Sequence, residues 1–244
     1  MRTPINSRRP AVVRVAVNAY FDMLYAAAES AVVPPDLTED SLNTLTVWDR
    51  SRKGKRVHAS PLPPTLVFSR TGLETTGILV GRDEVGEDRT VYSVERMFPV
   101  TALRTDSSVG HSCRSPELLN ELATALGAPW EVIGGFHSHP LMDVEVAEIE
   151  GEQRFGPSPG DLHRPPFFWG HAMDLIVTIT KVGDAKPTRP TRPGPCFQRR
   201  VGEFEFWIFA HAGIGTTVIL DVETAPKFAD RPPNRWRRRP PPPF

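Results

Sequence analysis

Residues 134–161 gather most of the side chains in this sequence that could carry out chemistry. The segment reads GGFHSHPLMDVEVAEIEGEQRFGPSPGD, with two histidines two residues apart, a run of carboxylates and a Ser-Pro-Gly-Asp sequence. In an extended segment alternate side chains share a face, so we expect His137 and His139 to point the same way. A histidine pair taken alone is more often structural or solvated, but two imidazoles on one face can also bind one metal cation.

Asp161 is the candidate third ligand. A catalytic zinc ion usually takes three protein ligands and leaves its fourth position to water. Asp161 ends the PSPGD sequence, whose prolines and glycine predict a tight turn with a restricted backbone. Such rigidity suits a ligand that must be placed accurately, so Asp161 is a strong candidate to join the two histidines at a metal site.

The elements that position these residues alternate between strand and helix patterns. One strand is predicted to lead into the two histidines, and amphipathic spacing predicts two helices. The helices are expected over 19–31 and 115–127, and the strands over 12–17, 74–82, 90–101, 129–140, 174–182, 203–210 and 216–223. We expect the strands over 74–82 and 90–101 to form a hairpin. The pattern predicts an α/β fold in which helices flank a mixed sheet, an α/β/α sandwich.

Proline clusters mark the limits of this domain, which is expected to span residues 11–225. Residues 32–72 are rich in Pro, Ser, Thr and charge, and are interpreted as an insertion. Residues 226–244 are basic and rich in proline, and are expected to form a disordered tail.

Composition excludes several classes of protein. The 244 residues include 29 basic and 29 acidic side chains, so net charge does not favour nucleic acid as a partner. The two cysteines, Cys113 and Cys196, are too few for a disulfide framework or a cysteine-based zinc site and suggest free thiols in a reducing compartment. No secretory signal and no spanning apolar run is apparent, so we expect a cytoplasmic protein that does not enter a membrane.

The order of these residues resembles a known motif. HSHP followed by SPGD, with Glu74 opening an upstream E-x-x-G-I-L-V-G strand, is similar to the JAMM motif of the JAB1/MPN/Mov34 (MPN+) metalloprotease family, in its prokaryotic branch. The resemblance implies a JAB/MPN-like fold and Zn²⁺ bound by His137, His139 and Asp161. It also implies that Glu74 moves a proton between water and the leaving amine, and that Ser158 donates a hydrogen bond to the oxyanion. Taken singly, Glu74 would be a solvated strand-edge carboxylate and Ser158 an ordinary turn serine.

The family resemblance further implies a function. Its members are zinc isopeptidases or peptidases that hydrolyse the bond after the C-terminus of a ubiquitin-like protein, which would make that protein, its conjugate and proteins of the conjugation system the expected partners. Two alternatives stay open. One is a peptidase that processes a sulfur-carrier protein or another small peptide substrate, and the other is a noncatalytic MPN scaffold that acts as a binding module.

The segment between Pro140 and Ser158 departs from the family pattern because it is longer. Residues 141–157 are expected to form an acidic loop, which is either a solvated surface loop or a segment that contacts a basic stretch of substrate or covers the cleft. They carry five carboxylates and one arginine: Asp143, Glu145, Glu148, Glu150, Glu152 and Arg154.

Two further residues receive no functional role. Asp174 is interpreted as an ordinary strand-start residue. Cys196 lies in a proline-rich segment without a nearby base in sequence, which argues against a cysteine protease.

Overall fold

The computed structural model describes the central part of the chain with gaps. The described residues are 10–32, 46–48, 56–58, 72–100, 102–104, 109–111, 114–163, 173–182, 194–212 and 216–223. The predicted tail over 226–244 and most of the predicted insertion over 32–72 lie outside these residues. No helix within the described ranges is long and apolar enough to cross a membrane.

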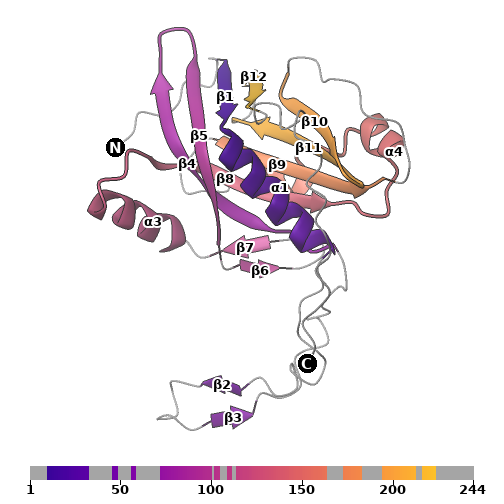
Figure 1. The fold of residues 1–244 in the computed structure, drawn as a ribbon, viewed down its shortest axis with the longest axis horizontal. Coiled ribbons are helices and arrows are strands. Elements are labelled where there is room, and N and C mark those ends of the chain that lie inside the picture. Colours follow the sequence, from indigo (N-terminus) through magenta and orange to yellow (C-terminus); the bar gives the residue numbers. More distant parts are fainter. Residues whose placement is uncertain are drawn as a thin grey trace, which may run out of the picture.

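An eight-stranded mixed sheet organises the fold (Figure 1). β8 (Glu131–Pro140) runs parallel to β9 (Met173–Lys181), and β1 (Ala11–Val15) runs parallel to β5 (Thr90–Pro99) and β12 (Val218–Val222), while the remaining neighbours are antiparallel. β2 (Thr46–Trp48) pairs with β3 (Arg56–His58), and β6 (Ala102–Arg104) pairs with β7 (Val109–His111), in separate antiparallel pairs. In spatial order, the strands of the large sheet are β10 (Cys196–Val201), β11 (Phe204–His211), β9 (Met173–Lys181), β8 (Glu131–Pro140), β4 (Thr76–Val85), β5 (Thr90–Pro99), β1 (Ala11–Val15) and β12 (Val218–Val222).

The helices are α1 (Val17–Val32), α3 (Arg114–Ala125), α4 (Val146–Gly151) and α5 (Pro159–His163). α1 and α3 agree with the helices predicted over 19–31 and 115–127. β4 and β5 form the predicted hairpin. The mixed α/β class expected from the sequence is therefore confirmed.

Helices pack on both faces of the sheet. Leu79 of β4 belongs to the hydrophobic cluster that includes Met23 of α1. Its neighbours Ile78 and Val80 belong to a second cluster, against which Leu119 of α3 packs. Because alternate residues of a strand point to opposite faces, α1 and α3 cover opposite faces of the sheet. Figure 1 shows α1 lying diagonally across its face.

Three elements differ from the sequence prediction. β10 begins at Cys196, at the end of the proline-rich segment for which no strand was predicted, and it pairs with β11. The turn predicted at PSPGD continues into the single helical turn of α5. The predicted acidic loop over 141–157 contains α4, whose Ile149 is 0% exposed. An apolar side chain buried to this extent shows that part of this segment packs against the domain.

Candidate metal centre

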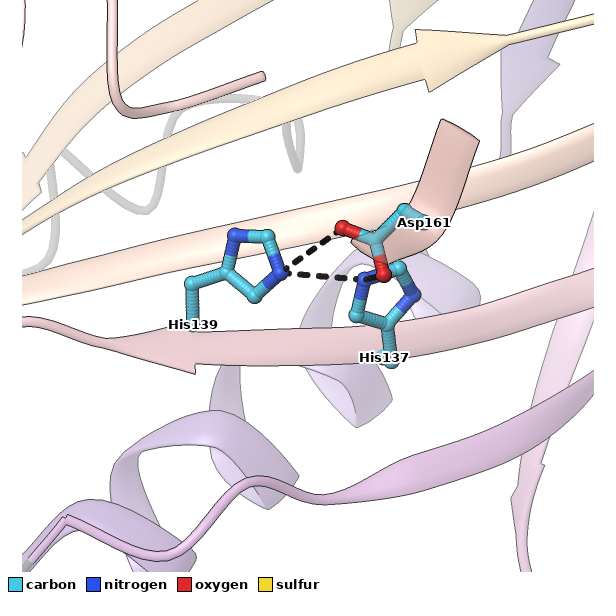
Figure 2. Close-up of side chains that lie close together, drawn as sticks. All are labelled: His137, His139 and Asp161. Carbon is cyan, nitrogen blue, oxygen red and sulfur yellow. Dashed lines mark hydrogen bonds and ion pairs between the residues drawn. The ribbon is translucent and has the colours of Figure 1, made fainter. Parts of the chain in front are cut away.

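β8 presents both histidines on one face, as predicted. Phe136 packs in the cluster that includes α1, so the alternation of the strand places His137 and His139 on the opposite face. His137 is only 1% exposed and His139 is mostly buried. Figure 2 shows the two rings on the same side of the strand. Their Nε2 atoms lie 3.1 Å apart.

Asp161 reaches the same point from α5. The backbone N–H of Ser158 donates a 2.7 Å hydrogen bond to Asp161 Oδ2, and the N–H of Asp161 donates a 3.3 Å bond to Ser158 Oγ. These reciprocal bonds form a capping box at the start of the helical turn. The Ser-x-x-Asp spacing therefore has a local structural role, because it fixes the direction of the carboxylate.

The three side chains converge with distances that suit a metal ion. Asp161 Oδ1 lies 3.6 Å from His137 Nε2, and Asp161 Oδ2 lies 3.4 Å from His139 Nε2. With one ligand atom taken from each residue, the three atoms lie within 4.8 Å of one another, so the group of two imidazoles and one carboxylate could hold a metal ion.

The pKa shifts of His139 and Asp161 favour the protonation states in which these side chains bind metal. Burial lowers the pKa of His139. Burial alone would raise the pKa of Asp161, but contacts with both histidines hold it well below the usual range. At neutral pH His139 is therefore neutral and Asp161 is ionised, which are the forms that bind metal.

His137 differs because it lies between two carboxylates. Burial lowers its pKa, but contacts with Asp161 and Asp174 outweigh burial and raise the pKa to about 10. In the metal-free protein the His137 ring is therefore a cation at neutral pH, with a proton on each nitrogen. A metal ion that binds Nε2 must displace the proton on that nitrogen, so metal binding and proton release are coupled here.

Glu74 precedes β4, close to the strand that carries the two histidines. The ladder between β4 and β8 ends where Thr76 pairs with His137. Beyond it, the N–H of Ser138 donates a 2.9 Å bond to the carbonyl oxygen of Thr75, the residue after Glu74. Glu74 is not one of the three residues whose ligand atoms converge.

Asp174 is the residue that sequence reasoning missed. Its Oδ2 lies 3.5 Å from His137 Nδ1, on the edge of the ring away from the other two ligands. Asp174 heads β9, where it pairs with Gly135 of β8. No local spacing links it to the histidines, since the contact depends on two strands that pair across a long connection. The available signal was an acidic residue at the head of an apolar strand.

The acidic segment over 141–157 covers the sheet beside this site. Thr180 Oγ1 donates a 2.7 Å bond to the carbonyl oxygen of Val144, and Gln198 donates a 2.7 Å bond to Glu150. Thr180 alternates with Ile179, which packs in the α1 cluster, so the segment lies on the same face as the two histidines. It is anchored to the sheet instead of extending into solvent as a loop.

The Cys196 thiol is free, and burial raises its pKa to about 12. A thiol with such a pKa is a poor nucleophile at neutral pH. This agrees with the sequence argument against a cysteine protease.

No protein-family model matches this chain, and no curated protein is significantly similar to it. Functional assignment therefore depends on the chemistry of the site.

Proposed function

We propose that this protein is a zinc-dependent hydrolase of the JAB1/MPN/Mov34 type, with the JAB/MPN-like arrangement of its sheet and helices. Its proposed reaction is cleavage of the peptide or isopeptide bond that follows the C-terminus of a ubiquitin-like protein. The observation that carries the proposal is the convergence of His137, His139 and Asp161, whose ligand atoms lie within 4.8 Å of one another. Glu74 adds support, because the residue after it, Thr75, is hydrogen-bonded to Ser138 of the histidine strand.

The ligand set favours zinc in a catalytic site. Imidazole and carboxylate donors suit zinc, and structural zinc sites are usually closed by four protein ligands. Three converging ligands leave a position for water or substrate. When bound, zinc supplies Lewis acidity, which polarises a carbonyl group and promotes the ionisation of water near neutral pH.

Glu74 is the proposed general base and acid. A carboxylate within hydrogen-bond reach accepts the proton of the attacking water and returns it to the leaving amine. Its position outside the converging group suits proton transfer better than metal binding.

Ser158 is the proposed donor to the oxyanion. Its Oγ accepts a hydrogen bond from the backbone N–H of Asp161. A hydroxyl group that accepts one hydrogen bond can still donate its own proton in another. A donor held beside a ligand of the ion can stabilise the negative charge that develops on the carbonyl oxygen.

Zinc content and cleavage of ubiquitin-like fusion proteins test this function together. We expect stoichiometric zinc in the purified protein, and its loss in a His137→Ala/His139→Ala variant. Glu74→Gln should retain zinc and lose cleavage. The matched control is Glu84→Gln, which replaces an exposed carboxylate of β4 and should change neither zinc content nor cleavage.

The outcomes separate the proposed enzyme from its alternatives. Absence of zinc, or zinc that is indifferent to both histidines, would contradict the metal centre. Zinc bound by the histidines without cleavage of any fusion protein or short peptide would instead support a noncatalytic scaffold. Cleavage of short peptides alone would support a peptidase with a small substrate.

A further inference from the structure

Asp174 lies behind His137, on the side of the ring away from the other ligands. We propose that Asp174 is a positioning residue that orients His137 as a metal ligand. The inference rests on the metal centre of the proposed function, but not on the reaction that the centre performs.

The two ring nitrogens of His137 face different partners. Nε2 faces Asp161 and His139, whereas Nδ1 lies 3.5 Å from Asp174 Oδ2. In a neutral imidazole only one nitrogen carries a proton. A carboxylate beside Nδ1 favours the proton on that nitrogen and leaves the Nε2 lone pair directed at the converging ligands.

Strand register explains how Asp174 reaches the ring. β8 and β9 are parallel, with Asp174 paired to Gly135 and Ile176 paired to His137. Paired residues share a face, so Asp174 and His137 are diagonal neighbours on the same face of the sheet. Gly135 has no side chain, so no side chain at that position stands between the carboxylate and the ring.

Burial of Asp174 also calls for an explanation beyond strand structure. Its side chain is 15% exposed, and its Oδ1 atom is buried without a hydrogen-bond partner among the described residues. Burying a carboxylate oxygen in this way costs free energy, which a strand-start residue on the surface would avoid. An interaction with a metal-binding histidine gives this placement a function, because such partners fix ring orientation and raise the basicity of the ligand.

Metal affinity tests the inference directly. We would titrate metal-free protein with zinc against a chromogenic chelator, and record the visible spectrum of the protein with Co²⁺ bound. Asp174→Ala should bind zinc about 10–100-fold more weakly, which is the usual effect of removing such a partner. Asp174→Asn retains an oxygen acceptor of similar shape, so it should lose less affinity. Both substitutions should shift the Co²⁺ spectrum, because the field of the His137 ligand changes.

Asp22→Asn is the matched control. Asp22 is a carboxylate of similar exposure, 22%, that pairs with Arg96 at 2.8 Å and belongs to α1, on the opposite face from the two histidines. Its substitution weakens the contact with Arg96 but should leave zinc affinity and the Co²⁺ spectrum unchanged. An equal loss of affinity in Asp22→Asn would overturn the inference, since loss of any partly buried ion pair would then suffice.

The outcomes separate this inference from the proposed function. Wild-type affinity in both Asp174 variants would overturn the role of Asp174 and leave the metal centre intact. Failure of wild-type protein to bind either metal would overturn both. If Asp174→Ala does not fold, the near-isosteric Asp174→Asn still decides the matter. Weaker metal binding in the Asp174 variants of a protein without hydrolase activity would support the positioning role and contradict only the reaction.

Discussion

Thr75 and Ser138 are joined by two reciprocal hydrogen bonds, of which only one is between backbone atoms. The N–H of Ser138 donates to the Thr75 carbonyl oxygen at 2.9 Å, and the N–H of Thr75 donates to Ser138 Oγ at 3.0 Å. The serine side chain thus replaces a backbone acceptor at the end of the β4–β8 ladder. It holds the residue next to Glu74 against the strand that carries both histidines.

Replacing Ser138 by alanine should separate proton transfer from metal binding. Ser138→Ala leaves the Thr75 N–H without its acceptor in a buried position, which costs about 1–3 kcal/mol of unfolding free energy. We expect zinc to be retained and cleavage to fall, because Glu74 loses its support. Urea denaturation, zinc analysis and the fusion-protein assay measure the three effects. Ser138→Thr keeps a hydroxyl and should restore activity, and loss of zinc in Ser138→Ala would contradict this division of roles.

Ser158 combines helix capping with the proposed oxyanion role, and two substitutions distinguish these roles. Ser158→Ala removes the acceptor of the Asp161 N–H, and loss of such a cap costs about 1 kcal/mol. Glycine at an N-cap costs only a few tenths of a kcal/mol, so Ser158→Gly should retain stability and zinc affinity better than Ser158→Ala. Neither variant has a hydroxyl, so both should lose cleavage. Full cleavage by Ser158→Gly would restrict Ser158 to its structural role.

The stability of metal-free protein should fall as pH rises above 6.5. The pKa of His137 is raised from 6.5 to about 10, although burial opposes the effect of the two carboxylates. A raised histidine pKa stabilises the folded protein fully below pH 6.5, and this contribution is lost as pH rises toward 10. Melting temperatures in chelator should show the difference between wild type and His137→Gln shrinking across this range. A difference that grows with pH would refute the protonated state of His137.

Gly134 lets β8 approach β9. A Cβ atom at this position would collide with the carbonyl oxygen of Met173. This oxygen belongs to the backbone, so it cannot move aside as the end of a flexible side chain could. Gly134→Ala should therefore push the two strands apart, destabilise the protein and weaken zinc binding through the His137–Asp174 contact. Thermal melting and zinc competition measure both effects. Gly151→Ala is the control, because a Cβ there meets nothing within 4 Å, and equal losses in the two variants would contradict the steric explanation.

The sequence predicts the candidate ligands well because their signals are local. His137 and His139 are separated by one residue on a strand, and the Ser-x-x-Asp spacing places Asp161 by a capping box that closes within four residues. The spacing of apolar residues also predicts α1, α3 and the β4–β5 hairpin, because the contacts within these elements are formed between near neighbours in the chain.

The features that the sequence did not predict depend on distant contacts or on atypical composition. Asp174 acts through the pairing of β8 with β9, and no feature near residue 174 indicates which strand lies beside it. α4 was missed because carboxylates dominate 141–157, while one residue, Ile149, provides its fully buried side chain. β10 was missed because the prolines before Cys196 are typical of a loop.

The parallel pairing of β8 with β9 has a consequence for resistance to proteases. Parallel neighbours require a crossover connection, and Asp161 lies within the connection that leaves β8 after His139. A metal ion bound by both residues would act as a cross-link that closes this chain loop and restricts its local opening. Cleavage sites within the crossover would then become less accessible whenever the ion is bound, so metal supply would also influence how long the folded protein survives.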